Sequence, residues 1–135
     1  MIKTLGFLTV SLIFMFYISI AAAQEVFFTK PKPNSVVESP IEFCMGVNGL
    51  ILEPASKGVN EGAGHHHLLI TGSLPKMIKS PLRKGRIDII HLGDGSECYS
   101  IELKPGKHKV RALFANGAHV PFYPPVTSTI KITVE

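Results

Sequence analysis

The sequence lacks the common signatures of a catalytic centre. It contains no Gly-x-Ser-x-Gly, no His-Glu-x-x-His, no phosphate-binding loop and no Cys-x-x-Cys-His haem-attachment motif. Asp88 and Asp94 are its only aspartates, so few aspartates are available for a Ser-His-Asp or paired-carboxylate mechanism. These absences argue against a hydrolase, and we expect a protein that is not an enzyme.

A strong excess of charge is also missing. Without Lys3, which lies in the N-terminal segment, the chain has 13 Lys and Arg residues and 10 Asp and Glu residues. A net charge near +3 is too small to predict nucleic-acid binding. The 112 residues that follow position 23 suffice for one modest core, and no second domain fits.

The first 23 residues are typical of a secretory signal peptide. Lys3 supplies a positive start, Leu5 to Ile20 are uncharged and largely apolar, and three alanines, 21–23, form a small-residue cleavage site. The alternative is an uncleaved membrane anchor, for which the segment is short. In either case we expect a periplasmic or secreted domain, residues 24–135, that is not an integral membrane protein once the signal is removed.

Short β-rich runs separated by turn residues predict an all-β fold, a single immunoglobulin-like β-sandwich of about seven strands. The expected strands are Val26–Thr29, Ile41–Val47, His65–Thr71, Arg86–Ile90, Glu97–Leu103, His108–Phe114 and Val126–Val134.

Alternation along these runs predicts which side chains face the core. Ile41, Phe43, Met45 and Val47 share one face of the second strand, and Tyr99, Ile101 and Leu103 share one face of the fifth. In the sixth strand Val110, Ala112 and Phe114 alternate with Lys109, Arg111 and Leu113, the outward set. A Pro-Gly turn at 103–108 indicates that the fifth and sixth strands are consecutive and antiparallel.

The chain has two cysteines, which in an exported protein are candidates for a disulfide. The same alternation places Cys44 and Cys98 on outward faces. The second and fifth strands are neighbours in an immunoglobulin-like topology, so we predict a cross-strand bridge within one sheet. The alternative is Cys44 as a soft metal ligand beside Met45.

Six histidines form the most unusual feature, and three of them are consecutive. On a strand, His65 and His67 project from one face about 7 Å apart, close enough to converge on one ion. His66 shares the phase of Leu68, which places it at the core margin as a weaker ligand candidate.

Topology brings two more histidines to this pair. If seven strands alternate in direction, the start of the third, the end of the fourth and the end of the sixth meet at one end, together with His91 and His119. His108 opens the sixth strand at the other end, and we interpret it as a structural residue bonding across the turn. Three or four imidazoles without thiolates suit copper or zinc, although a polar loop surface without an ion is equally compatible with the residues alone.

Four segments carry a family resemblance: Gly64-His-His-His-Leu-Leu-Ile70, His91-Leu-Gly-Asp-Gly95, Leu103-Lys-Pro-Gly-Lys-His108, and His119-Val-Pro121 with Pro124-Pro-Val126. In combination they resemble an exported bacterial family known as domain of unknown function 4399. The family pattern has histidines that match all six of this chain, and the resemblance supplies no established activity. Two departures are Asn116-Gly-Ala118, where relatives often have an acidic residue, and the two cysteines.

Two functions follow as hypotheses. The first is a binding protein for a copper or zinc ion, held by His65, His67, His91 and His119, that acts as carrier, buffer or sensor. The second is an envelope or adhesive interaction module without metal, using loops 48–64 and 115–125 and an apolar patch of Val120, Phe122 and Tyr123. A metal-dependent enzyme would need an open coordination position beside a pocket.

Overall fold

The computed structural model describes residues 22–70, 74, 79–82 and 88–135. In these parts of the chain it contains nine β-strands and one short 3-10 helix. The elements are β1 (Glu25–Lys30), β2 (Val36–Val37), β3 (Ile41–Asn48), β4 (Ile51–Leu52), η1 (Ala55–Lys57), β5 (Ala63–Leu69), β6 (Ile89–His91), β7 (Cys98–Ile101), β8 (Gly106–Ala115) and β9 (Thr127–Val134). Among these residues no helix has the length and apolar character needed to cross a membrane.

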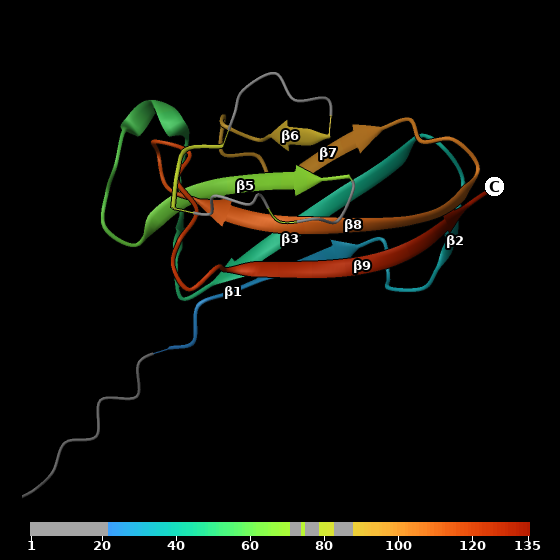
Figure 1. Ribbon diagram of the computed structural model, residues 1–135, viewed down its shortest axis with the longest axis horizontal. Helices are drawn as coiled ribbons and strands as arrows, with labels where there is room; N and C mark the ends of the chain where they lie inside the picture. The colour runs from blue at the N-terminus through green and yellow to red at the C-terminus, as the bar shows by residue number, and fades with distance from the viewer. Residues whose placement is uncertain (1–21, 71–73, 75–78, 83–87) are drawn as a thin grey trace, which may run out of the picture.

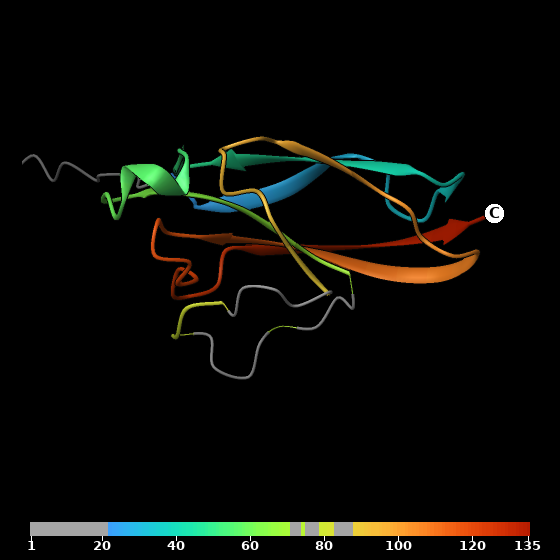
Figure 2. The same ribbon diagram turned by 90° about the horizontal axis from the view of Figure 1, so that it is seen from above.

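The strands form two layers, which Figure 2 shows edge-on. One sheet has the order β1-β3-β7, and the other has the order β2-β9-β8-β5-β4, with β6 also pairing with β5 (Figure 1). β4 pairs with β5 at Ala63 and Gly64, whereas β6 pairs with it at residues 67–69. The predicted all-β sandwich is therefore confirmed, with the short strands β2 and β4 added to the predicted set.

The core lies between the sheets and is built from the alternating residues. Phe43, Met45 and Phe114 are at most 1% exposed, and the inward residues of β9 complete the cluster. The predicted inward faces of β3 and β8 are thus confirmed. Each strand buries one side because its successive side chains point to opposite faces.

Two details of the prediction are wrong, and one outward residue is more buried than alternation alone indicates. The turn at 103–108 does not join hydrogen-bonded neighbours, because β7 pairs with β3 and β8 belongs to the other sheet. Tyr99 is 43% exposed, since β7 is an edge strand that the second sheet does not fully cover. Leu113 lies on the outer face of the larger sheet as predicted, and it is fully buried there in a second apolar cluster, together with Leu69, Leu82 and Ala115.

Some strand ends differ from those predicted or lie outside the described residues. Residues 86–87 of the expected fourth strand and Thr71 at the end of the third belong to undescribed segments. The expected strand at 97–103 shortens to Cys98–Ile101.

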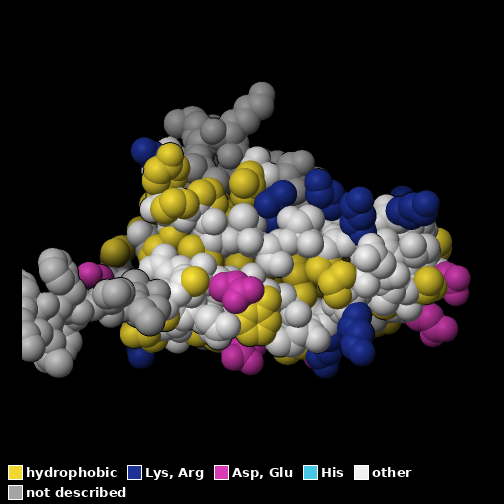
Figure 3. Space-filling model, turned by 90° about the horizontal axis from the view of Figure 1, so that it is seen from below, with side chains coloured by type: hydrophobic (Ala, Val, Ile, Leu, Met, Phe, Trp, Pro, Cys, Tyr) yellow, Lys and Arg dark blue, Asp and Glu magenta, His cyan; other side chains and the backbone are white. Residues whose placement is uncertain are grey.

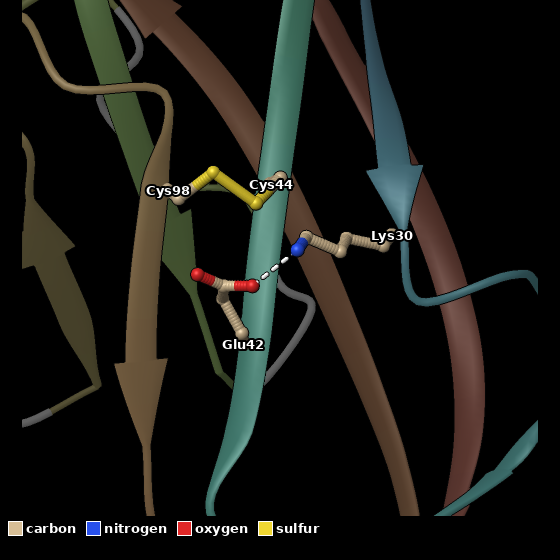
Figure 4. The surroundings of a disulfide bond; sticks show 4 residues. All are labelled: Lys30, Glu42, Cys44 and Cys98. Carbon is tan, nitrogen blue, oxygen red and sulfur yellow. Dashed lines mark ion pairs between the residues drawn. A yellow bond between two sulfur atoms is a disulfide. The ribbon is translucent and has the colours of Figure 1, made fainter.

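The predicted disulfide joins β3 and β7 within one sheet (Figure 4). Cys44 and Cys98 are directly opposite in the strand register, with Cα atoms 4.1 Å apart. Beside the bridge, Lys30 forms an ion pair with Glu42. Cys44 is only 4% exposed, because it lies in the central strand with Lys30 of β1 on one side and Cys98 on the other. Both sulfurs are consumed by the bridge, so neither is available as a thiolate ligand.

Candidate metal centre

Two of the three consecutive histidines occupy the outer face of β5. In register, His65 is paired with Ala115 and His67 with Leu113, two members of the outer apolar cluster. His66 points to the opposite face, where its ring contacts the Phe114 ring edge-on at 5.1 Å between centroids. Alternation therefore sends His65 and His67 to a common site and His66 into the core.

The other two histidines reach this site from separate parts of the chain. His91 ends β6 and lies directly opposite His67 in the register. His119 lies in the loop after β8, with a positive φ of 62°. The side chains of His65, His67, His91 and His119 each offer a nitrogen within 4.8 Å of the others.

The shortest separations join three of these rings. His65 Nε2 lies 2.9 Å from His91 Nε2 and 3.1 Å from His119 Nδ1. Four nitrogens bound to one tetrahedral ion at about 2.05 Å would lie about 3.3 Å apart. The two shorter separations are close to that spacing, and all four nitrogens lie within 4.8 Å of one another, so the cluster has the dimensions of a four-coordinate site.

The cluster is mostly shielded from solvent. His65 and His67 are at most 1% exposed, His119 is half-buried, and His91 is exposed. The buried side is closed by the outer apolar cluster, and the Leu82 amide donates a hydrogen bond to the His119 carbonyl at 2.9 Å. The exposed side opens at His91, which borders a surface hollow of about 270 Å³ that also contains Asp94 and Tyr99.

Burial leaves polar atoms without partners. Nδ1 of His65 and both ring nitrogens of His67 have no hydrogen-bond partner among the described residues. An unpaired buried polar group costs about 1–3 kcal/mol, and metal coordination is one way to satisfy it. The orphaned nitrogens of His67 are thus consistent with a ligand role for that ring, whereas His65 faces the cluster with Nε2 and not with its orphaned Nδ1.

The same burial disfavours the protonated imidazole. Desolvation, reinforced by repulsion from His91, His119 and His66, lowers the pKa of His65 from 6.5 to about 4. Desolvation and repulsion from His65, His91 and His119 lower the pKa of His67 to about 2. Both rings are neutral at physiological pH, which is the form that binds metal ions.

Two residues that were not predicted to belong to the site shape its loops. A Cβ added at Gly93 would lie 2.1 Å from Cε1 of His91, so the ring has its observed position only beside a glycine. Asn116 Oδ1 accepts hydrogen bonds from the amides of Ala118 and Val120 at 3.0 and 3.1 Å, on either side of His119. Asparagine before a turn was visible in the sequence as a signal for such side-chain capping.

The remaining candidates lie apart from the cluster. His66 faces the core, with both ring nitrogens lacking a hydrogen-bond partner in the described part of the chain, and burial lowers its pKa to about 4. His108 Nε2 donates a hydrogen bond to the Lys104 carbonyl at 2.7 Å, across the Pro-Gly turn.

The apolar patch expected on loop 115–125 is only partly present. Phe122 packs on the core and stacks on Phe114 at 5.9 Å, and Tyr123 is 68% exposed with the Lys79 ammonium 4.3 Å from its ring centre.

Comparison with known proteins identifies the family and little else. No curated protein matches the chain. Among solved structures it is similar to an endo-beta-1,4-mannanase from Thermotoga petrophila, at 14% sequence identity and a TM-score of 0.49. That similarity covers 84% of this chain and only 20% of the mannanase chain. A family model, Domain of unknown function (DUF4399), matches residues 43–135, a range that contains all six histidines and both cysteines. The chain therefore belongs to the DUF4399 family.

Proposed function

We propose that this protein is an exported metal-binding module that holds one copper(II) or zinc ion through His65, His67, His91 and His119. One observation carries the proposal: four imidazoles from three separate parts of the chain place nitrogens within 4.8 Å of one another. The module binds the ion and does not catalyse a reaction, serving as a carrier, buffer or sensor.

The donor set supports these two ions over others. Calcium and magnesium prefer oxygen ligands, and copper(I) prefers sulfur. The two cysteines are bridged to each other, and the clustered donors are all imidazoles. Imidazole suits both zinc and copper(II), which leaves the choice between them to experiment.

Placement of the ligands supports reversible binding. His65 and His67 stand on a central stretch of the sheet, a rigid platform, whereas His91 and His119 lie at or beyond the ends of β6 and β8. Exposure of His91 gives the ion a route to solvent. An export route agrees with the disulfide, because such bridges persist in oxidising compartments.

Calorimetric titration of the metal-stripped protein with zinc and with copper(II) tests the proposal. We expect saturable binding of one ion per chain. The double variant His65→Ala, His67→Ala should abolish it, whereas His108→Ala, which removes a histidine outside the cluster, should bind like the wild type. Flat traces for both ions would reject the metal site and favour an envelope interaction module instead.

A second variant tests geometry without removing a ligand. Gly93→Ala keeps all four imidazoles but forces the His91 ring to move, because the added Cβ would lie 2.1 Å from it. We expect an affinity loss of about 10- to 100-fold, comparable to the loss of a residue that orients a ligand. Unchanged affinity in Gly93→Ala would show that binding does not depend on the position that the His91 ring has in the structure.

A further inference from the structure

A row of basic side chains runs along the outer face of the larger sheet, away from the histidine cluster. Lys107 and Lys109 alternate with inward residues on β8, and Lys131 projects from β9; all three are exposed. In the space-filling view, Lys and Arg side chains gather along the upper margin of the molecule (Figure 3). Arg111 continues the row and donates a hydrogen bond to Thr127 at 3.3 Å.

The row contains an unfavourable contact. Lys109 lies directly opposite Lys131 in the strand register, and like charges in opposite positions destabilise a sheet. Among the described residues, none of the three lysines forms an ion pair. Their neighbours on this face of β9 are Thr129 and Thr133, which bring no negative charge. The repulsion is therefore uncompensated within the described structure, and an external anion would relieve it.

The surface around the three lysines has room for more than one anionic group. A shallow hollow of about 460 Å³ lies among the lysines and reaches Asn34, and no carboxylate lines it. Lys107 and Lys109 are about 7 Å apart along the strand, so the three ammonium groups can each meet a separate phosphate. A two-dimensional array of phosphates would engage all three.

We propose that this lysine row, Lys107, Lys109 and Lys131, docks the protein on a membrane surface rich in anionic phospholipid headgroups. Charge complementarity supports this occupant, because clustered lysines bind anionic bilayers with roughly additive contributions. The surface does not suit single-stranded nucleic acid, because the residues beside the lysines on β9 are threonines and not aromatic side chains on which bases stack.

Vesicle co-sedimentation of the protein purified after export of the full chain tests this. We expect binding to vesicles that contain one-third phosphatidylglycerol, little binding to pure phosphatidylcholine, and a steep loss as salt rises. Each surface lysine contributes about fivefold to such binding. Replacing all three by glutamine should therefore weaken it about 100-fold.

A charge-matched control separates the row from net charge. Three other exposed lysines lie on β1, in the turn after it and in η1, and replacing them by glutamine removes the same charge and should change binding by less than about threefold: Lys30, Lys32 and Lys57. If the triple row variant does not fold, Lys109→Gln alone should still weaken binding about fivefold.

Three results would overturn the proposal. Equal losses of vesicle binding in the row variant and in the control would show that net charge alone explains the binding. Equal binding to neutral and anionic vesicles would point to an apolar anchor. Displacement from vesicles by millimolar inorganic phosphate would indicate a site for one small anion. Because vesicle binding is measured with chelator present, its outcome is independent of the metal site.

Discussion

Acid should destabilise the metal-free protein well before its carboxylates titrate. The cause is the histidine run 65–67, whose burial lowers the pKa values from 6.5 to about 4, 4 and 2 in chain order. The unfolded chain accepts a proton at each of these residues near pH 6.5, whereas the folded protein does not until about pH 4 or below. Between these values the unfolded state binds more protons, so stability is complete above pH 6.5 and falls as the pH drops.

The size of the effect at pH 5.5 depends little on the folded pKa values, because all three lie below 5.5. One pH unit below the unfolded value, each histidine costs about 1.4 kcal/mol. The three together should lower the free energy of unfolding by about 4 kcal/mol between pH 7.5 and 5.5. Asp and Glu side chains remain ionised throughout this window.

Urea denaturation at the two pH values, with chelator present, measures the loss. The matched control is His66→Leu, which removes one buried histidine from the core face and leaves the four clustered histidines in place. Its loss on acidification should be smaller than that of the wild type by about 1.4 kcal/mol. Equal stability at both pH values, or an identical loss in the variant, would refute the assignment of these histidines as buried neutral groups.

Three further outcomes follow from the described contacts. Replacing both Cys44 and Cys98 by alanine should lower the free energy of unfolding by about 4 kcal/mol, because the bridge closes a loop with a sequence separation of 54; an unchanged urea midpoint would contradict this. Lys131→Thr should raise the free energy of unfolding by about 0.5 kcal/mol, and with it the thermal midpoint, since it removes the repulsion with Lys109. A variant that is less stable than the wild type at low salt would count against that repulsion. Asn116→Ala should weaken zinc binding about 10-fold in calorimetry by freeing the loop of the last ligand, while full affinity would show that the loop is held by other contacts.

Much of the fold and the membership of the candidate site could be predicted, because both depend on periodicity and strand direction. Alternation alone sends His65 and His67 to one side of β5 and His66 to the other. Alternating strand directions bring His91 and His119 to the same end. Neither rule says how far a face is covered. Leu113 is buried in a cluster that includes Leu82, which comes from a loop without a recognisable period.

The role of small residues was hidden for a related reason. Gly93 matters because the His91 ring occupies the space that its Cβ would take, and Gly117 matters because a Cβ there would lie 1.8 Å from the Gly58 carbonyl oxygen. The first contact is local and depends on the rotamer of a side chain, and the second joins two loops that are far apart in the sequence, so turn patterns predict neither. A glycine in a turn sequence usually indicates that the backbone needs conformational freedom. Gly93 instead leaves space for a side chain that packs against it.

Stability and binding make opposite demands on the central strand. Leu68 and Leu69 continue β5 beyond the histidines as fully apolar residues on its two faces, which shows what packing alone favours there. His67, equally buried, has two ring nitrogens without a hydrogen-bond partner among the described residues, at a cost of about 1–3 kcal/mol for each unsatisfied group. A metal ion would satisfy one nitrogen of His67 and would do nothing for His66, which faces the other way. A ligand on the outer face would recover part of the free energy that the fold loses at His67, which supports the proposal that the histidine cluster is a binding site.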